Sequence, residues 1–201
     1  MKCLMLVCML LCITNVHAQN KDIDWLRSIN KSRTPTTDHI MVGLTNSVYP
    51  VAGAIPVAQL IYGYTKHDST TIHYAWLNVI GIGLNTVVTF GLKFGIHRDR
   101  PYTSYADINP YQHDTDPSFP SGHTSFAFET ATALSMQYPH WYIIAPAYAW
   151  AGTVAYSRMY LGMHYPTDVL AGAIIGTGSA LLSYKLNQWL HTHHKLSLIH
   201  I

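Results

Sequence analysis

Charge, cysteine and repetition are all scarce in this sequence. Lys, Arg, Asp and Glu make up 11% of the 201 residues, less than half the usual share of about a quarter. The net charge is +2 with histidine neutral, which is too small to favour nucleic acid as a partner. Internal repeats, low-complexity tracts and blocks of like charge are absent. The length fits one domain with a substantial core.

The cysteines all lie within the first twelve residues, in a segment typical of a secretory leader. Lys2 precedes an apolar run from Cys3 to Ile13, and a small-x-small pattern ends at Ala18. We therefore predict a signal peptide over residues 1–18 and a mature domain over residues 19–201. That domain contains no cysteine and would lie beyond the plasma membrane.

Two alternatives for this leader stay open. It could remain as an uncleaved membrane helix, although its apolar run is short for a span of about 20 residues. A lipoprotein anchored through Cys12 is less favoured, because Leu10 and Leu11 stand where small residues are needed.

Long apolar runs dominate the rest of the chain, where apolar residues reach 49% overall. A polar stretch from Gln19 to Asp38 comes first and spaces Trp25, Leu26 and Ile29 as on a short amphipathic helix. Five runs follow: Ile40–Tyr64, Tyr74–Leu92, Thr124–Tyr138, Trp141–Tyr156 and Val169–Tyr184. Their length favours helices, and none shows the alternation of a strand. We predict an all-α fold, a bundle of five membrane-associated helices plus the short N-terminal helix.

The membrane prediction depends on run length. The first two runs are long enough to cross a bilayer, whereas the last three are marginal. Gly172 and Gly176 form a small-xxx-small pattern that suits close packing of membrane helices. Against spanning, mean hydropathy is only +0.10. Four amides also lie inside the two longest runs: Asn46, Gln59, Asn78 and Asn85. A membrane-embedded bundle is favoured, and a soluble periplasmic bundle remains the alternative.

The order of the predicted spans also indicates which side of the membrane the motifs face. With a cleaved leader the mature N-terminus starts outside, and five spans then place two loops, Ile96–Ser121 and Ser157–Thr167, on the outer side. These loops hold most of the polar motifs. We therefore expect an inner-membrane protein whose site faces the periplasm.

The first motif is "LKFGIHRDRPY", at the end of the second run. Lys93 and Arg100 are seven residues apart, about two helical turns, and Pro101 discourages helical geometry at Arg100. The ordinary alternative is a basic helix end favoured by the helix dipole.

The second motif is "FPSGHTS", where the third run begins. Free N–H groups at a helix start bind anions, and Gly122 after Ser121 allows a phosphate to approach the backbone. His123 would then stand where it can protonate a leaving oxygen. Alone, the motif could also be a serine N-cap beside an unrelated histidine.

The third motif is "YSRMYLGMHYPTDVLAG". Arg158 offers a forked cation for phosphate oxygens. His164 and Asp168 are four apart, so a carboxylate could orient the imidazole and leave its other nitrogen as a nucleophile. Alternatively, Asp168 only complements the start of the next helix. A metal site is disfavoured, because the neighbours are cations and not further ligands.

Taken in order, the motifs read Lys, six residues, Arg-Pro; Pro-Ser-Gly-His; Ser-Arg, five residues, His, three residues, Asp. This pattern resembles the type 2 phosphatidic acid phosphatase and vanadium haloperoxidase superfamily, over roughly Asp22–Trp189. The resemblance implies a helical bundle that hydrolyses phosphate esters without metal or other cofactor. It also implies that His164 forms a phosphohistidine, oriented by Asp168, and that His123 protonates the leaving group. The implied phosphate ligands are Lys93, Arg100, Arg158 and the backbone of Ser121 and Gly122.

Other polar residues receive weaker interpretations. The cluster from His191 to Lys195 could bind a metal, but a solvated tail is favoured. A solvated loop is likewise favoured over head-group contacts for His97, Asp99, His113, Asp114 and Asp116.

The leading function is hydrolysis of a lipid-linked phosphate, with lipid A phosphate as first candidate. Alternatives are an undecaprenyl pyrophosphate or phosphatidylglycerophosphate phosphatase, a soluble periplasmic acid phosphatase, a haloperoxidase, and a non-enzymatic transporter or binding module. The expected partners are the lipid phosphate and the membrane; neither nucleic acid nor another protein is predicted.

Overall fold

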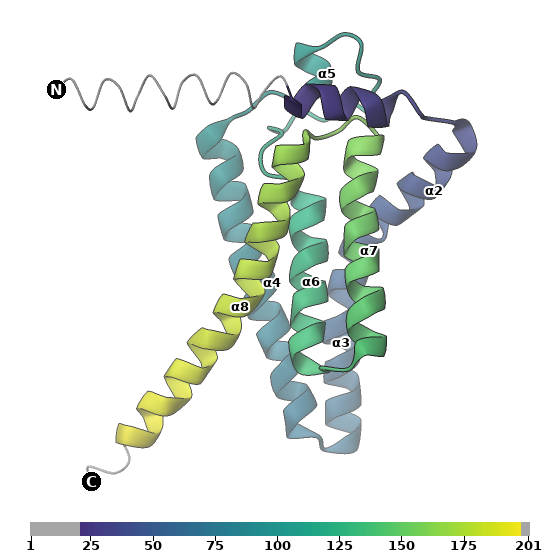
Figure 1. Cartoon of the computed structure of the whole chain (residues 1–201). Helices are drawn as coiled ribbons and strands as arrows, with labels where there is room; N and C mark the ends of the chain where they lie inside the picture. The colour runs from purple at the N-terminus through teal and green to yellow at the C-terminus, as the bar shows by residue number, and fades with distance from the viewer. Residues whose placement is uncertain (1–20, 198–201) are drawn as a thin grey trace, which may run out of the picture.

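The computed structural model describes residues 21–197, which contain helices and no strand (Figure 1). A helix over residues 21–30, called here the N-terminal helix, comes first. It is followed by α2 (Pro35–Asn46), α3 (Val48–Lys66), α4 (Ser69–Ile96), α5 (Pro101–Ser104), α6 (Gly122–Gln137), α7 (Trp141–Tyr160) and α8 (Pro166–Ser197). The all-α prediction is confirmed. The predicted leader and its cleavage point lie outside the described residues, as do the side chains from Leu190 onward, including the His191–Lys195 cluster.

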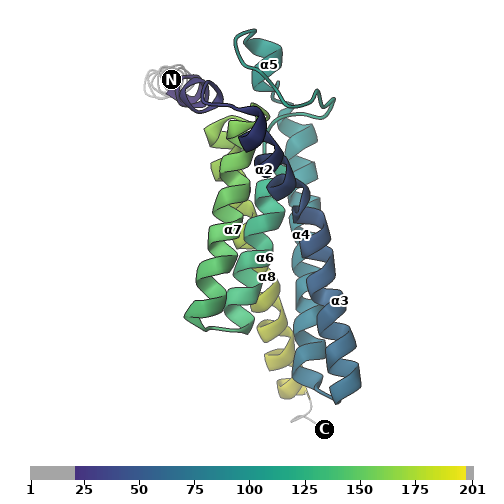
Figure 2. The same cartoon turned by 90° about the vertical axis from the view of Figure 1, so that its right-hand side faces the viewer.

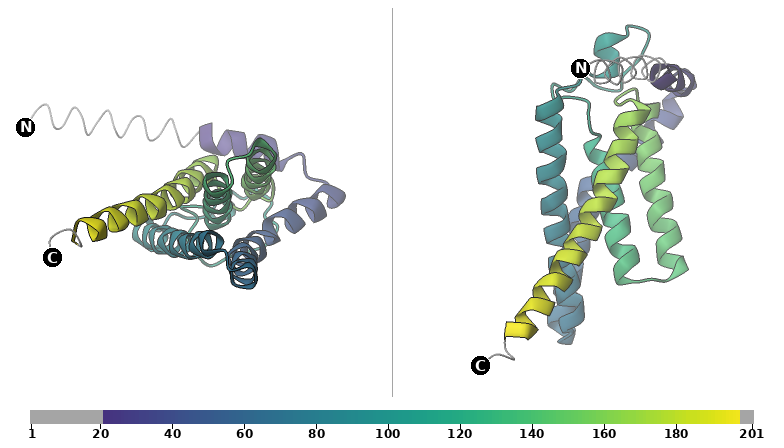
Figure 3. Two further views of the ribbon diagram at one scale, coloured as in Figure 1. Left: turned by 90° about the horizontal axis from the view of Figure 1, so that it is seen from below. Right: turned by 60° about the vertical axis from the view of Figure 1, so that its left-hand side comes forward.

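The helices α3, α4, α6 and α7 run roughly along one common axis (Figures 1 and 2). α3 and α4 form one hairpin and α6 and α7 another, and α6 packs against both α7 and α8. α8 crosses the bundle obliquely, and its C-terminal part leans away from the other helices (Figure 3). α4 and α7 end, and α6 and α8 begin, at the same end of the bundle, called here the upper end.

The sequence alone suggested that the first apolar run forms one helix, but the structure divides it into two. α2 stops at Asn46 and α3 restarts at Val48, so that α2 leans away from the bundle in Figure 1. Pro50 explains the break: it has no N–H to bond the carbonyl of Asn46, and its ring would clash with that carbonyl in a continuous helix. The Ser47 hydroxyl at the break donates to Leu44 O at 2.7 Å.

The second run continues to Ile96, where α4 ends with His97 in the left-handed conformation at φ 52°. The helix therefore stops before Arg100, as Pro101 indicates. Lys93 lies in the last turn of α4, whereas Arg100 is the extended residue just before α5.

The predicted close packing at Gly172 and Gly176 is present. A Cβ at Gly172 would lie 2.6 Å from Ser121 O, and one at Gly176 would lie 2.0 Å from Ser125 O. Both oxygens belong to the backbone at the start of α6. The two glycines therefore let α8 approach the segment that carries the second motif.

Three stretches of the described chain are long and apolar enough to cross a membrane: Pro35–Lys66, Ser69–Ser104 and Pro166–Trp189. Large apolar side chains along α3, α4 and α8 are exposed, including Ile61, Val87 and Leu170. An exposed apolar surface of this kind suits lipid contact. The sequence predicted five membrane-associated helices, and for α6 and α7 this stays a prediction.

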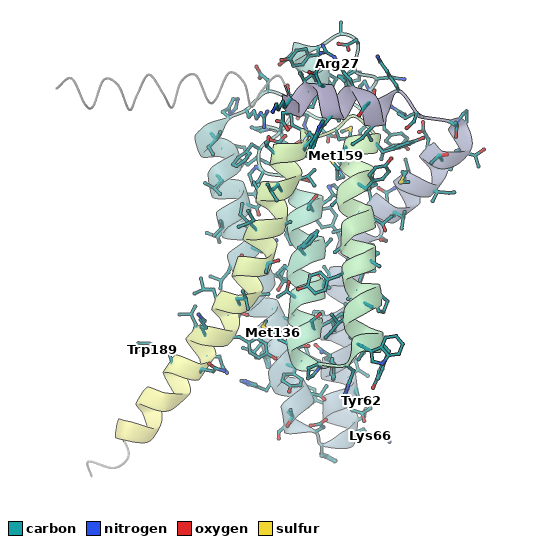
Figure 4. The ribbon with its side chains drawn as sticks, viewed as in Figure 1. Arg27, Tyr62, Lys66, Met136, Met159 and Trp189 are labelled. Atoms are coloured by element: carbon teal, nitrogen blue, oxygen red, sulfur yellow. The ribbon has the colours of Figure 1, made fainter. Side chains whose placement is uncertain are left out.

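The N-terminal helix lies across the upper end of the bundle, and Figure 4 labels Arg27 on it and Met159 below it. Ile23 and Leu26 are buried, whereas Trp25 is 68% exposed. A short helix is thus present where the sequence predicts one, and Leu26 faces inward as expected, but Trp25 points outward and does not share the buried face.

Candidate active site

The three sequence motifs meet at the upper end of the bundle. They line a cavity of about 230 Å³ whose walls also include aromatic side chains. The motif residues that line it are Lys93, Arg100, Gly122, His123, Arg158 and His164. They come from five separate segments, so the fold itself assembles the cluster: helices that end or begin at one level bring their terminal residues together.

Two of the three predicted cations are held by the loop between α5 and α6. Lys93 contacts the carbonyl of Pro117 and pairs with Asp116 at 2.7 Å. Arg100 donates through Nε to Asp116 O at 2.9 Å and through Nη1 to Met163 O at 3.2 Å. Both side chains are at most 5% exposed, so these contacts fix them beside the cavity.

Arg158 is buried in a different way. Its Nη1 donates to Thr45 Oγ1 of α2 at 3.0 Å, while its buried Nε has no hydrogen-bond partner among the described residues. Buried donors are rarely left unpaired, and a phosphoryl oxygen is an acceptor that this site could receive.

The carboxylates of Asp114 and Asp116 belong to the site, which corrects the expectation that they are only solvated loop residues. Both line the cavity. Asp116 bridges Lys93 at 2.7 Å and Arg100 at 2.6 Å, and Asp114 lies 3.1 Å from Arg100. Partial burial alone would raise the pKa of Asp116, but the hydrogen bond from Lys93 and the charges of Arg100 and Lys93 outweigh it and lower the pKa to about 2.

His164 lies in the short loop between α7 and α8 and is 2% exposed. Gly162 makes this loop possible, because it has φ +70° and a Cβ there would come within 2.7 Å of Asn109 O. Burial, followed by the positive charges of Arg158, Arg100 and Lys93, lowers the pKa of His164 well below its ordinary value. This shift favours the neutral ring, which has a lone pair to offer.

Asp168 is linked to His164 through an intermediary in this structure. Its Oδ2 lies 3.8 Å from His164 Nδ1, beyond a direct hydrogen bond. The Ser118 hydroxyl lies between the two groups, donating to Asp168 Oδ2 at 2.5 Å and lying 3.4 Å from His164 Nδ1. The Tyr165 N–H also donates to Asp168 Oδ2, at 3.1 Å.

The second motif provides only part of the predicted phosphate cradle. The N–H of Ser121 donates to Asp168 O at 3.0 Å, and its hydroxyl is 3.0 Å from that of Thr124. The backbone N–H of Ser121 therefore ties the start of α6 to α8 and is not available to a phosphate, whereas phosphate binding by the Ser121 hydroxyl stays a prediction. Gly122 and His123 do line the cavity, and the His123 ring lies against that of Tyr49, with 4.9 Å between centroids.

Residues 74–192, more than half of the chain and all three motifs, match the family described as the PAP2 superfamily. The chain belongs to the PAP2 superfamily. It is a phosphatase and a membrane protein, as the family and its solved membrane members show. The family resemblance drawn from the three motifs is thereby confirmed.

Relatives of this PAP2 phosphatase differ in the lipid that their names report. An undecaprenyl-diphosphatase of Sulfolobus acidocaldarius is 29% identical over 169 residues, which are 82% of this chain and 78% of that protein. A lipid A 1-phosphatase of Rhizobium etli is 32% identical over 130 residues, 59% of this chain and 53% of that protein. The crystal structure of Aquifex aeolicus LpxE superposes with a TM-score of 0.68 at 30% identity, covering 81% of this chain and 94% of that one.

Three residues of this PAP2 phosphatase site were not predicted from the sequence: Thr45, Tyr49 and Ser118. Thr45 and Tyr49 lie in an apolar run, where no pattern distinguishes them from packing residues. Ser118 is only three residues before Ser121, and its closeness to the second motif was the one available signal.

Proposed function

We propose that this PAP2 phosphatase hydrolyses a lipid-linked phosphate monoester without metal, through a phosphohistidine on His164. The convergence of Lys93, Arg100 and Arg158 around one cavity with two histidines carries the proposal. Three cations can neutralise a phosphoryl dianion, and forked guanidinium groups match its oxygens. Among the described residues, no group of three or more His, Cys, Asp or Glu side chains is arranged to hold a metal ion.

In the proposed first step, Nε2 of His164 attacks phosphorus while the ester P–O bond breaks. Nδ1 of His164 faces the Ser118 hydroxyl, which donates to Asp168, and this arrangement favours the tautomer with the proton on Nδ1 and a free lone pair on Nε2. Burial, followed by the charge of Arg158, lowers the pKa of His123 to about 2 in the free site. A bound phosphoryl dianion offsets that positive charge, so in the complex the protonated His123 ring donates its proton to the leaving alkoxide oxygen, which departs as an alcohol.

In the proposed second step, His123 takes a proton from a water molecule, and the resulting hydroxide attacks the phosphohistidine. The P–N bond breaks, its electron pair returns to His164, and inorganic phosphate leaves. Each histidine ends the cycle in the state in which it began. Lys93, Arg100, Arg158 and the Gly122 backbone would stabilise the phosphoryl charge in both steps.

Access to the cavity suits an amphiphilic substrate. Phe90 and Phe126 line it together with Tyr49, and Phe90 is 44% exposed on a helix long enough to span the membrane. A lipid tail could therefore stay in the bilayer while the phosphate enters the polar end. With the predicted orientation, the site would face the periplasm and meet lipids of the outer leaflet of the inner membrane.

We favour lipid A phosphate as substrate. Asp114 and Asp116 stand beside the cations and would repel the second phosphate of a diphosphate, whereas carboxylates accept hydrogen bonds from sugar hydroxyls. The lipid A 1-phosphatase relative supports the same choice. Undecaprenyl pyrophosphate is the second candidate, supported by the relative from S. acidocaldarius.

The test is phosphate release by purified protein from lipid A, undecaprenyl pyrophosphate, phosphatidylglycerophosphate and a soluble ester, with and without EDTA. We expect the highest kcat/KM on lipid A and no loss in EDTA. In cells, deletion should leave lipid A one phosphate heavier by mass spectrometry. Accumulated undecaprenyl pyrophosphate with unchanged lipid A would support the second candidate, and loss of turnover in EDTA, restored by added metal, would contradict the metal-free mechanism.

A further inference from the structure

Asp22, at the start of the N-terminal helix, has a carboxylate that is only 3% exposed. Its Oδ1 accepts the backbone N–H of Thr167 at 2.9 Å, and its Oδ2 accepts the Thr167 hydroxyl at 2.5 Å. The same Oδ2 pairs with Nη2 of Arg98 at 2.9 Å. Because the Asp22 carboxylate is almost fully buried and makes three polar contacts, it is held in one orientation.

Arg98 carries this contact to the active site. It lies between α4 and α5, and its Nη1 donates to Asp168 Oδ1 at 2.6 Å and to the Thr167 hydroxyl at 2.7 Å. The guanidinium also lies over the Tyr165 ring, 3.8 Å from its centroid. One planar fork thus joins two carboxylates, Asp22 through Nη2 and Asp168 through Nη1.

The other oxygen of Asp168 faces the nucleophile. Asp168 Oδ2 receives the Ser118 hydroxyl, which lies beside Nδ1 of His164. A continuous chain of contacts therefore runs from the N-terminal helix through Arg98 and Asp168 to His164. Asp22 lies outside the three sequence motifs, and Arg98 lies within the first one but received no role there.

We propose that Asp22 is a positioning residue for the phosphatase reaction, acting on His164 through Arg98 and Asp168. The inference rests on the proposed function, in which His164 is the nucleophile. Two carboxylates share one guanidinium, so this cluster keeps one net negative charge. When His164 bonds to phosphorus, its ring becomes cationic, and a nearby negative charge stabilises that state. Without the charge of Asp22, Arg98 would neutralise Asp168 alone.

The N-terminal helix has other attachments that do not involve Asp22. Leu26 is fully buried, and the Asn30 side chain donates to the carbonyls of Asn109 and Tyr160 at 3.0 Å each. Arg27 pairs with Asp107 at 2.7 Å. Replacing Asp22 by an isosteric amide therefore tests its charge while these contacts keep the helix docked.

The experiment compares Asp22→Asn, Arg98→Lys and the double variant in the full-length protein. Asp24→Asn is the matched control, the same chemical change two positions along the helix at a side chain that is 67% exposed. The readouts are kcat and KM on a lipid phosphate monoester and the rate of phosphoenzyme formation after rapid quenching. Arg98→Lys breaks the same chain from the other side, so the result does not depend on one variant folding.

We expect Asp22→Asn to lower kcat and the rate of phosphoenzyme formation on the order of tenfold or more. KM should stay within about twofold, because the phosphate-binding cations are untouched. Asp24→Asn should match the wild type, and the double variant should lose no more than its worse single parent, because both act through one chain.

A kcat for Asp22→Asn equal to that of Asp24→Asn would overturn the inference, as would a loss confined to KM or losses that multiply in the double variant. If the wild-type enzyme forms no phosphohistidine, the proposed mechanism fails and the inference fails with it. That result appears with the wild type alone, so the two failures are distinguishable.

Discussion

At the scale of single residues, the two histidines face one cavity from different surroundings. His164 is 2% exposed and is joined to Asp168 through Ser118, whereas His123 stands at the start of α6 against Tyr49. A carboxylate-linked imidazole suits nucleophilic attack, and an imidazole without such a partner suits exchange of a proton with the leaving group.

His123→Ala should therefore distinguish substrates by their leaving groups. General acid assistance contributes about a hundredfold to ten-thousandfold, so phosphoenzyme formation from a lipid alkyl phosphate should slow by that factor. An activated aryl phosphate needs no proton on its leaving oxygen and should slow much less. Rapid-quench measurement with both esters checks this. His164→Ala is the control and should form no phosphoenzyme from either, while equal slowing of both esters in His123→Ala would remove His123 from the acid role.

Asp116 occupies the position between Lys93 and Arg100 where phosphate oxygens would bind, so Asp116→Asn should strengthen inhibition by vanadate or inorganic phosphate. Removing a negative charge this close to a bound anion should lower the inhibition constant on the order of tenfold. Arg100 keeps its bond to Met163 O and Lys93 its contact with Pro117 O, so the cations stay in place.

The pH dependence of this effect follows from the depressed pKa of Asp116, about 2 in the folded protein. Its carboxylate is ionised above that value, and its contribution to folding is lost only as pH falls from about 4 toward 2. The gain in inhibitor affinity should thus be constant between about pH 5 and pH 8. Asp107→Asn, in the same loop but paired with Arg27, is the control. Weaker inhibition in Asp116→Asn would mean that Asp116 holds the cations and does not compete with phosphate.

At the scale of helices, the contact between α6 and α8 determines where the second motif lies. A Cβ on Gly176 would meet Ser125 O at 2.0 Å and Glu129 N at 2.8 Å, and neither backbone atom can move without shifting α6. Gly178 is two residues further along α8, where no atom of the described residues lies within 4 Å of such a Cβ.

Gly176→Ala should therefore destabilise the protein by about 1–3 kcal/mol of unfolding free energy or more. This loss would be seen as a lower thermal unfolding midpoint in detergent. Gly178→Ala should be neutral or stabilise by up to about 1 kcal/mol, because alanine is the better helix former. Equal midpoints for the two variants would contradict the close packing of α8 on α6. Because Ser125 is two residues after His123, Gly176→Ala should also reduce activity.

The features that the sequence predicted are those set by residues close to one another along the chain. Apolar run length predicted the helices, and the spacing within each motif predicted six cavity-lining residues. The break at Ser47 was missed because Pro50 sits inside an otherwise continuous apolar run. The pairing of Asp116 with Lys93, and of Asp22 with Arg98, joins residues 23 and 76 positions apart, and no local pattern encodes such contacts.

The backbone N–H of Ser121 shows the opposite error at this scale. Its place before Gly122 resembles an anion-binding helix start, but packing of α8 commits its N–H to Asp168 O. A helix N-terminus offers free donors only where no neighbouring segment already accepts them.

At the scale of the whole molecule, the site lies at one end of the bundle, and the side of the membrane that this end faces decides which lipids it meets. Ser104, at the end of α5, is exposed at the upper end. Ser69, at the start of α4, is also exposed and follows three residues after Lys66, which Figure 4 labels at the other end of the bundle. Residues 19–201 contain no cysteine, so after removal of the leader each Ser→Cys variant would have a single thiol.

We expect Ser104→Cys to react with a membrane-impermeant maleimide in cells whose outer membrane has been permeabilised. Ser69→Cys should react only with a membrane-permeant reagent. Both variants introduce the same thiol at an exposed serine, one at each end of the bundle. Each therefore serves as the labelling control for the other. The reversed pattern would place the site on the cytoplasmic side, where it would meet lipids before they cross the membrane, and would contradict the proposed periplasmic orientation. Labelling of both variants by the impermeant reagent would contradict a membrane-spanning arrangement of α4.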